Sequence, residues 1–166
     1  VNIVTGDGST GEYLVNHANV DKIAFTGSTE VGKSIIQALA GSRKKYTLEL
    51  GGKAANIIFE DAPIDQAVEG IINSIFFNQG HVCCAGSRLY VQESVSKEII
   101  SKLKSRMENL ILGDPLDKNT DIGAINSKTQ LEKIQMYLDI GVDEGSTIYQ
   151  STCTIPKKGY WCAPTL

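Results

Sequence analysis

The sequence predicts an α/β protein in which short parallel strands alternate with helices. Apolar runs alternate with stretches of helical period, which is the pattern of βαβ units. The pair Gly51-Gly52 interrupts this pattern once, and the alternation restarts after it. Of the 166 residues, 42% are hydrophobic and 21% are charged. This ordinary globular composition excludes a disordered or collagen-like chain.

Before Gly51, three apolar runs are separated by two helical stretches. Strands are expected at the apolar runs, which cover residues 1–5, 20–25 and 46–50. The two helices between them are expected to end near His17 and Ala40. Ser28 or Thr29 is the expected N-cap of the second helix, because a hydroxyl there accepts hydrogen bonds from the first free N–H groups.

After Gly52, the same kind of pattern predicts a second set of elements. Apolar runs predict strands at residues 56–59, 89–92, 147–149 and 160–162. Helical periodicity predicts helices at residues 64–77, from a cap at Ser94 or Ser96 to about Ile111, and at 129–140. Glycine, proline and polar residues predict connecting loops at residues 78–86, 113–115 and 156–159.

The charge and the hydropathy pattern exclude two classes of partner. Sixteen Lys and Arg residues against nineteen Asp and Glu residues give a net charge of -3, and the densest basic run covers only residues 43–45. This leaves no electrostatic footprint for nucleic acid. No apolar run approaches the roughly 18 residues that a transmembrane helix needs. We therefore expect neither a nucleic acid nor a membrane partner.

The cysteines indicate a reducing compartment. They are Cys83, Cys84, Cys153 and Cys162. Because two of them are adjacent, the set does not suit a secreted disulfide framework, and we expect a cytoplasmic protein. The chain begins at Val1 rather than Met, inside a predicted strand, so we expect it to be part of a longer protein.

The hexamer Gly6-Asp7-Gly8-Ser9-Thr10-Gly11 has the spacing Gly-x-Gly-x-x-Gly between a predicted strand and a predicted helix. Glycines at this spacing let a backbone approach a pyrophosphate in dinucleotide-binding folds. No acidic residue is placed at a following strand end to hold a ribose, and a tight turn into a helix would use the same glycines. The hexamer alone leaves both interpretations open.

Residues 27–34 read Gly-x-x-x-x-Gly-Lys-Ser after a predicted strand, which is the pattern of a P-loop that binds nucleoside triphosphates through Lys33 and Ser34. The acidic end of the run 57–61 could hold its magnesium ion. Glu30 argues against a P-loop, because a carboxylate in the phosphate cradle would cost about 1–4 kcal/mol at close range. A capped helix N-terminus that meets one pyrophosphate explains the motif equally well. A P-loop NTPase is therefore kept as an alternative.

The run Leu48-Glu49-Leu50-Gly51-Gly52-Lys53 places a carboxylate at the end of an apolar strand. Ligands of open α/β sheets bind at the carboxyl ends of the strands, so Glu49 is a candidate functional residue. The structural alternative is a partly buried acid paired with Lys53 or Arg43.

Cys83 and Cys84 lie in the polar loop that follows the long predicted helix. An exposed loop thiol among amide donors can react, whereas a buried thiol behaves as a small hydrophobe. Adjacent cysteines without a Cys-x-x-Cys or His-x-x-x-His partner do not suit zinc, so no metal site is expected. His81 is the only nearby imidazole, which leaves a Cys/His hydrolase as a further alternative.

Three motifs occur in order along the chain: Phe25-Thr26-Gly27-Ser28-Thr29-Glu30-Val31-Gly32, Leu48-Glu49-Leu50-Gly51-Gly52-Lys53 and Phe77-Asn78-Gln79-Gly80-His81-Val82-Cys83. Together they resemble the NAD(P)-dependent aldehyde dehydrogenase superfamily, and the similarity covers essentially the whole chain. Cys83 follows Glu49 by 34 residues, as the resemblance requires. Residues 60–67 and 80–84 are most similar to the family 16 branch.

The resemblance implies a fold, a cofactor and a substrate. The implied fold joins a Rossmann-like cofactor-domain segment, residues 1–50, to an α/β catalytic-domain segment, residues 51–166, each incomplete. The implied cofactor is NAD or NADP, the substrate is an aldehyde, and the full-length protein would be a homo-oligomer. The residues that match the family's pyrophosphate-binding segment are Gly27, Ser28, Thr29, Glu30, Val31 and Gly32.

The resemblance also implies roles for two residues in catalysis. Cys83 matches the cysteine whose thiolate attacks the aldehyde, giving a thiohemiacetal and then, after hydride transfer, a thioester. The Cys83 backbone N–H matches half of the family's oxyanion hole. Glu49 matches the general base that activates the hydrolytic water, a role worth roughly 10²- to 10⁴-fold in rate. Cys84 is implied to be a non-essential neighbour.

This chain departs from the family pattern in two ways. His81 stands where many members carry Gln, and Val82 precedes the nucleophile, which we expect to alter the substrate channel more than the chemistry. Other site residues of the family fall outside the chain, so we expect the chain alone to oxidise no aldehyde. A non-catalytic member that only binds a partner or acts as a scaffold is a third alternative.

Overall fold

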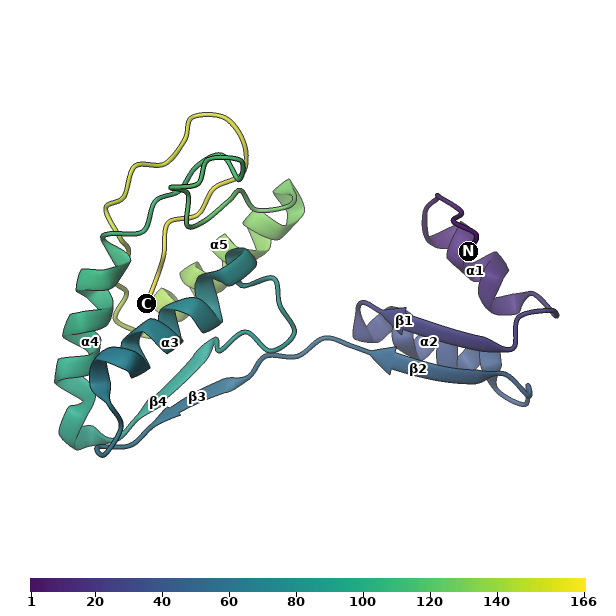
Figure 1. Cartoon of the computed structure of the whole chain (residues 1–166), viewed down its shortest axis with the longest axis horizontal. Helices are drawn as coiled ribbons and strands as arrows, with labels where there is room; N and C mark the ends of the chain where they lie inside the picture. The colour runs from purple at the N-terminus through teal and green to yellow at the C-terminus, as the bar shows by residue number, and fades with distance from the viewer. The chain divides into compact units, whose positions relative to one another are not determined.

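The computed structural model describes residues 1–166, which divide into two compact units, Val1–Gly52 and Lys53–Leu166. Each unit contains one pair of parallel strands with helices packed against it (Figure 1). The predicted α/β class with parallel sheets is therefore confirmed. The observed bounds agree with the predicted ones to within a few residues for most elements.

The first unit is built around a parallel crossover. Strand β1 (Lys22–Thr26) pairs with β2 (Lys45–Glu49), and α2 (Thr29–Leu39) connects them. Helix α1 (Gly8–Asn16) packs beside α2. The core of this unit consists of Val15, Ile35 and Leu39, which contact apolar residues of both strands. Ser28 caps α2, since its Oγ accepts a hydrogen bond of 3.2 Å from the Val31 N–H, as predicted.

The predicted strand at residues 1–5 is wrong. These residues form no strand, and Val1, Ile3 and Val4 are exposed. A strand is held by hydrogen bonds to a neighbouring strand, and β1 pairs only with β2 in this unit. Apolar composition alone therefore does not make this segment a strand.

The second unit places two helices on one side of a strand pair (Figure 1). Strand β3 (Ala55–Ile58) pairs in parallel with β4 (Arg88–Val91), and α3 (Ile64–Phe76) followed by the 3₁₀ turn η1 (Phe77–Gly80) connects them. Helices α4 (Glu93–Met107) and α5 (Lys128–Asp143) follow. The core residues come from α3, α4 and the segment after α4: Val68, Ile71, Ile72, Ile99, Leu103, Met107, Leu110, Leu112 and Ile122.

Alternation along β3 and β4 sets which side chains reach this core. Ile58, Leu89 and Val91 pack against it, whereas the register partners Ile57 and Tyr90 are 62% and 58% exposed on the other face. This is the period of two that places successive strand side chains on opposite faces. The helices therefore cover only one face of the pair.

The two strands predicted at residues 147–149 and 160–162 do not form, and the structure has only an isolated antiparallel bridge between Gln150 and Thr165. Tyr149 and Leu166 exchange backbone hydrogen bonds of 2.7 and 2.8 Å, and the Ser151 N–H donates to the Pro164 carbonyl. The antiparallel contact thus lies at residues 149–151 and 164–166 rather than at 160–162. The Tyr160 carbonyl instead accepts a 2.8 Å hydrogen bond from the Ile125 N–H. Pairing partners distant in the sequence decide this register, and a short apolar run does not reveal them.

The predicted cap of α4 is also wrong. Helix α4 begins at Glu93 with Gln92 at the N-cap position. The Ser94 hydroxyl donates to Glu60 Oε2 at 2.7 Å, and the Ser96 hydroxyl donates to the Glu93 carbonyl. Both serines therefore use their hydroxyls as donors from within the first turns of the helix, rather than accepting hydrogen bonds at its start.

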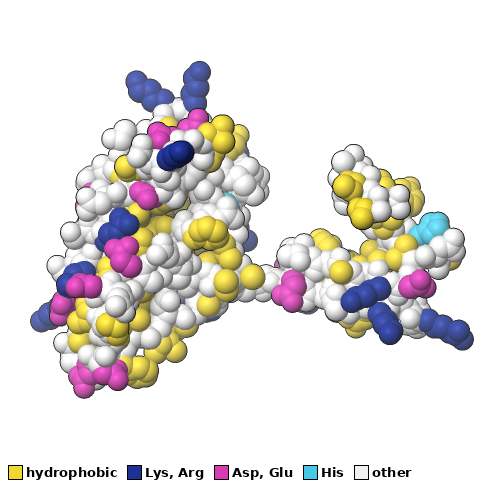
Figure 2. Space-filling model, in the orientation of Figure 1, with side chains coloured by type: hydrophobic (Ala, Val, Ile, Leu, Met, Phe, Trp, Pro, Cys, Tyr) yellow, Lys and Arg dark blue, Asp and Glu magenta, His cyan; other side chains and the backbone are white.

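The surface of the second unit mixes charges of both signs. On the face shown in Figure 2, acidic and basic side chains alternate over this unit. Three of the four ion pairs lie along α3 and α4, including Arg106 with Glu69 at 2.8 Å and Lys102 with Asp65. None of the helices is both long and apolar enough to span a bilayer.

We predict that Ile99→Ala lowers the free energy of unfolding by about 2–5 kcal/mol, because Ile99 is fully buried and its truncation leaves a cavity. Ile100→Ala is the matched control: its side chain is 40% exposed, so the same truncation should cost less than about 1 kcal/mol. Urea denaturation of the intact protein, followed by circular dichroism, measures both. Equal losses for the two variants would contradict this core.

Candidate active site

In the first unit, the N-terminus of α2 and the end of β2 lie side by side. Thr26 pairs with Glu49 in the register of the two strands, and the Gly27 N–H donates a 3.0 Å hydrogen bond to the Glu49 carbonyl. The chain then enters α2 through the Ser28 cap. Glu49 and the segment Gly27–Gly32 are therefore brought together at the carboxyl edge of the parallel pair, where ligands of α/β sheets bind.

Two glycines of this segment lie close against neighbouring apolar side chains. A Cβ at Gly27 would lie 2.3 Å from the ring of Phe25, and a Cβ at Gly32 would lie 2.5 Å from Leu50 Cδ2. Both distances are far shorter than a van der Waals contact. Close approach of α2 to β2 thus accounts for Gly32, a role that the third glycine also has in dinucleotide-binding motifs.

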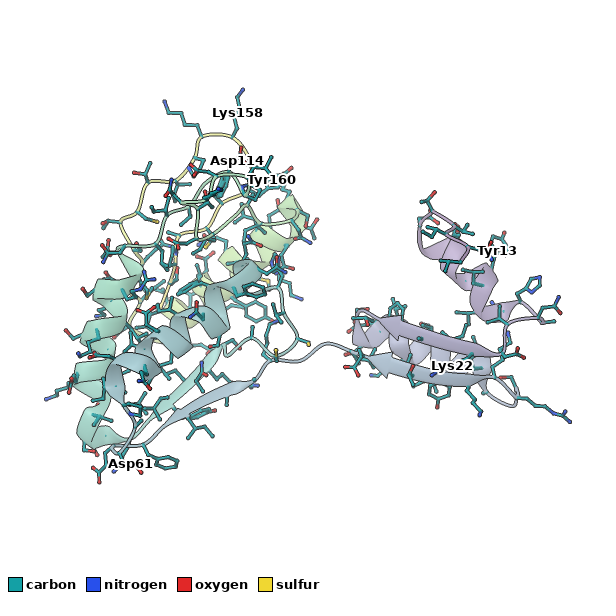
Figure 3. All side chains as sticks on the ribbon, in the orientation of Figure 1. Tyr13, Lys22, Asp61, Asp114, Lys158 and Tyr160 are labelled. Atoms are coloured by element: carbon teal, nitrogen blue, oxygen red, sulfur yellow. The ribbon has the colours of Figure 1, made fainter.

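A cavity of about 790 Å³ lies between α1, β1 and α2. Tyr13 and Lys22, labelled in Figure 3, mark α1 and the start of β1. The lining of this cavity is mainly apolar, with Asp7, Ser34 and a few other polar residues among the lining groups. This volume falls within the roughly 300–1,000 Å³ that is typical of small-molecule sites.

The glycine hexamer is the start of α1 and not a loop after a strand. Asp7 is the N-cap, and its Oδ1 accepts hydrogen bonds from the Ser9 N–H at 3.0 Å and the Ser9 hydroxyl at 2.7 Å. These hydrogen bonds hold the pKa of Asp7 below its ordinary value. Gly8 and Gly11 are helical and line the cavity, and each has open space where a Cβ would stand.

The P-loop interpretation fails on the geometry of α2. The helix already begins at Thr29, so Lys33 and Ser34 lie within it and not at the end of a phosphate-cradling loop. The Ser34 hydroxyl donates to the Glu30 carbonyl at 3.1 Å, one helical turn earlier. A P-loop requires several non-helical N–H groups between its two glycines, and here those residues form helix.

Glu49 itself is exposed at the end of β2. The alternative of a partly buried structural acid therefore fails. Glu49 belongs to the first unit and Cys83 to the second.

In the second unit, a strained backbone carries the chain from α3 to the cysteines. Asn78 and Gln79 adopt φ values of 49° and 55°, and Gly80 has φ +72°. The left-handed region is unfavourable for residues with a Cβ, and such residues concentrate at functional sites. A turn follows in which the Ala85 N–H donates to the Val82 carbonyl at 3.1 Å. Cys83 and Cys84 occupy its two central positions, and both are exposed.

We call this turn, residues 82–85, the cysteine turn. Together with Gly86, which follows it directly, the cysteine turn is fastened to β3 and α3 by a set of hydrogen bonds. The Asn56 amide donates to Ser74 Oγ at 2.9 Å and to the Gly86 carbonyl at 3.2 Å. The Gly86 N–H donates to the Ser74 carbonyl, and the Ala54 N–H donates to the Ala85 carbonyl at 3.0 Å. The turn is therefore held from a strand and from a helix at once, which fixes the direction in which Cys83 is presented.

Lys53 is a contact of this turn that the sequence reasoning missed. Its Nζ donates a 2.9 Å hydrogen bond to the carbonyl of Val82, the residue before Cys83. The Lys53 carbonyl in turn accepts a hydrogen bond of 3.1 Å from Arg88 Nη2. The only signal in the sequence was the position of Lys53 directly after the two glycines. A single sequence does not show that a side chain contacts a carbonyl 29 residues further along the chain.

The four cysteines have different surroundings. Cys83 and Cys84 are exposed, whereas Cys153 and Cys162 are half-buried. Burial raises the pKa of the Cys162 thiol. The His81 Nε2 atom is enclosed and makes no hydrogen bond, so it does not pair with a thiol. A Cys/His hydrolase is therefore not supported.

The sequence model of the aldehyde dehydrogenase family matches residues 1–166. The chain belongs to the aldehyde dehydrogenase family. An aldehyde dehydrogenase of Davidiella tassiana is 46% identical over 168 residues, covering all of this chain and 34% of that protein. The structure of an NAD-dependent aldehyde dehydrogenase from Sinorhizobium meliloti has a TM-score of 0.92 and 38% identity, covering 98% of this chain and 32% of that one.

A further similar structure contains a bound dinucleotide. The structure of PnpE in complex with nicotinamide adenine dinucleotide has a TM-score of 0.89 and 37% identity, covering 96% of this chain and 34% of that one. The chain thus spans about a third of the length of each of these three proteins.

We predict that, in the native protein at about pH 7.5, iodoacetamide modifies Cys83 and Cys84 before Cys162, because thiolate is the reacting form. Burial raises the pKa of Cys162, so its thiolate fraction is small at this pH and grows as the pH rises through that pKa. Peptide mass spectrometry at several pH values measures the rates, with urea-unfolded protein as the control. Faster native modification of Cys162 than of Cys83 would contradict the burial described here.

We predict that Gly86→Ala loosens the cysteine turn. A Cβ there would lie 2.2 Å from Asn56 Nδ2, and such overpacking costs about 1–3 kcal/mol. Gly70→Ala in α3 is the matched control, because its Cβ meets open space and alanine favours a helix. Hydrogen exchange of the peptide 77–88 should accelerate only in the first variant. Unchanged exchange in Gly86→Ala would show that the turn does not depend on the Asn56 contacts.

Proposed function

We propose that the protein is an aldehyde dehydrogenase that oxidises an aldehyde to a carboxylic acid through a covalent adduct on Cys83, with NAD or NADP as acceptor. The observation that carries the proposal is the presentation of an exposed thiol on a turn fastened to β3 and α3 in a chain of this family. A rigidly held nucleophile is what addition to a carbonyl carbon requires.

The first unit fits a dinucleotide cofactor. The positive end of the α2 dipole, capped by Ser28, suits a pyrophosphate, and the segment Gly27–Gly32 would hold it. The mainly apolar cavity between α1 and α2 is large enough for an aromatic base, and the open backbone at Gly8 and Gly11 permits a close approach. The solved NAD complex of PnpE supports this assignment. When bound, the nicotinamide accepts the hydride from the substrate carbon.

Cys83 forms the covalent bond to the substrate. Its thiolate attacks the aldehyde carbon, the C–S bond forms, and the carbonyl π electrons move to the oxygen. The Cys83 N–H donates no hydrogen bond within the chain, so it is free to donate to this oxyanion. Once the hydride has left the carbon, a thioester remains on Cys83.

Glu49 releases the product. As a general base it takes a proton from water, the hydroxide formed attacks the thioester carbon, and the C–S bond breaks to give the carboxylic acid and the Cys83 thiolate. Glu49 is exposed at the carboxyl end of β2 next to the Gly27 segment, which is a suitable position for a base that water must reach.

We predict that Cys83→Ala in the intact protein lowers aldehyde-dependent NAD⁺ or NADP⁺ reduction by more than about 10³-fold, since the nucleophile is lost. Cys84→Ala, at the adjacent exposed position, is the matched control and should stay close to wild type. Glu49→Gln should lower steady-state turnover by roughly 10²- to 10⁴-fold. It should also let the Cys83 thioester accumulate, which peptide mass spectrometry detects.

The same assay tests the proposal as a whole. If the wild-type intact protein reduces neither NAD⁺ nor NADP⁺ with a panel of aliphatic and aromatic aldehydes, the enzymatic assignment falls and a binding or scaffold role takes its place. If Cys83→Ala retains activity while Cys84→Ala loses it, the nucleophile has been assigned to the wrong cysteine.

A further inference from the structure

The peptide bond between Val82 and Cys83 has an asymmetric set of partners. Its carbonyl oxygen accepts two hydrogen bonds, one of 2.9 Å from the Lys53 ammonium and one of 3.1 Å from the Ala85 N–H. Its N–H, which belongs to Cys83, has no acceptor within the chain. One side of this amide is therefore saturated by donors, one of them charged, while the other side is free to bind an oxyanion.

Donors at the carbonyl change the properties of the N–H. Electron density in an amide is delocalised between oxygen and nitrogen, so a donor at the oxygen draws density from the nitrogen and makes the N–H a stronger donor. Hydrogen bonds in a chain polarise one another in this way by about 10–30% per bond, and a charged donor has a larger effect than a neutral one. The Lys53 contact also fixes the plane of the amide and with it the direction of the Cys83 N–H.

We propose that Lys53 is a positioning residue that orients and polarises the Val82–Cys83 amide, so that the Cys83 N–H stabilises the oxyanion formed at Cys83. This inference rests on the proposed function, because it concerns the addition step of that reaction. Lys53 transfers no proton: the new bond joins Cys83 Sγ to the carbonyl carbon, and the electron pair of the broken π bond remains on the oxygen.

The structure holds Lys53 in place for this role. Arg88 Nη2 donates to the Lys53 carbonyl at 3.1 Å. The N–H of Ala54, the residue after Lys53, donates to the Ala85 carbonyl at the end of the cysteine turn. The Lys53 side chain is exposed, so solvent screens its charge. We therefore expect an effect smaller than the 10²- to 10³-fold loss that follows removal of an oxyanion-hole donor itself, about 5- to 50-fold.

The test compares two reactions of Cys83 that differ in one respect. Acylation by p-nitrophenyl acetate passes through a tetrahedral oxyanion, whereas alkylation by iodoacetamide displaces iodide and forms none. Neither reaction needs the cofactor. Lys53→Met removes the charge and the donor while keeping the length of the side chain, Lys53→Arg keeps both, and Lys97→Met changes an exposed lysine of α4 that makes no ion pair.

In the intact protein we expect Lys53→Met to slow acylation of Cys83, and to lower kcat for an aldehyde, by about 5- to 50-fold with little change in KM. Alkylation of Cys83 should stay near the wild-type rate, Lys53→Arg should restore most of the acylation rate, and Lys97→Met should match wild type. An equal loss of acylation and alkylation in Lys53→Met would overturn the proposal, because Lys53 would then only support the position of the thiol. An unchanged acylation rate would also overturn it.

The two proposals fail in different ways. A wild-type protein that acylates at Cys83 but reduces no dinucleotide with any aldehyde refutes the dehydrogenase assignment, while the acylation ratio of Lys53→Met to wild type still decides the role of Lys53. A wild-type protein that oxidises aldehydes, with Lys53→Met equal to it in acylation and turnover, refutes only the role of Lys53.

Discussion

The hydrogen bonds that fasten the cysteine turn to β3 and α3 are the interaction on which the proposed chemistry depends. A thiol on a free loop would sample many directions, and a displacement of about 1 Å can cost 10²-fold in rate. Asn56 and Ser74 hold Gly86 from a strand and from a helix, and Ala54 holds Ala85. The left-handed residues Asn78 and Gln79 then bring the chain into the turn. The strain at those two residues persists because the packed core of the second unit determines the path on both sides of the loop.

The parallel strand pairs explain where the functional groups stand. Two parallel strands run in the same direction, because a crossover connection brings the chain back to the starting edge of the sheet. The carboxyl ends of both strands therefore lie at the same edge. In the first unit this edge carries Glu49 and Ser28, the cap of α2. The residue before Ser28, Gly27, donates its N–H to the Glu49 carbonyl. The segment that leaves β2 continues to Lys53, whose ammonium binds the peptide before Cys83. One short motif therefore supplies the candidate base to the first unit and a backbone anchor to the second.

Glycines in this chain occupy two kinds of position: some allow close packing, and others line a cavity. Gly32 lets α2 approach Leu50, and Gly86 leaves room for the Asn56 amide that braces the cysteine turn. Gly8 and Gly11 have no neighbour where a Cβ would stand, and they line the cavity beside α1. A glycine motif read from sequence does not separate these cases. The P-loop pattern at residues 27–34 shows the difficulty, since its second glycine is a packing glycine inside a helix.

The sequence by itself determined the α/β class, the order of most strands and helices, the Ser28 cap and the motifs that identify the family. Periodicity, caps and spacing act over a few residues and can be read locally. Tertiary structure alone decided that residues 1–5 form no strand and that residues 149–151 meet 164–166 only in an isolated antiparallel bridge. It also decided that Lys53 binds the Val82 carbonyl. The physical reason is the same in each case. A strand or a side-chain anchor exists only when its hydrogen-bond partner is brought to it, and partners 15 to 30 residues away are placed by the packing of the whole unit.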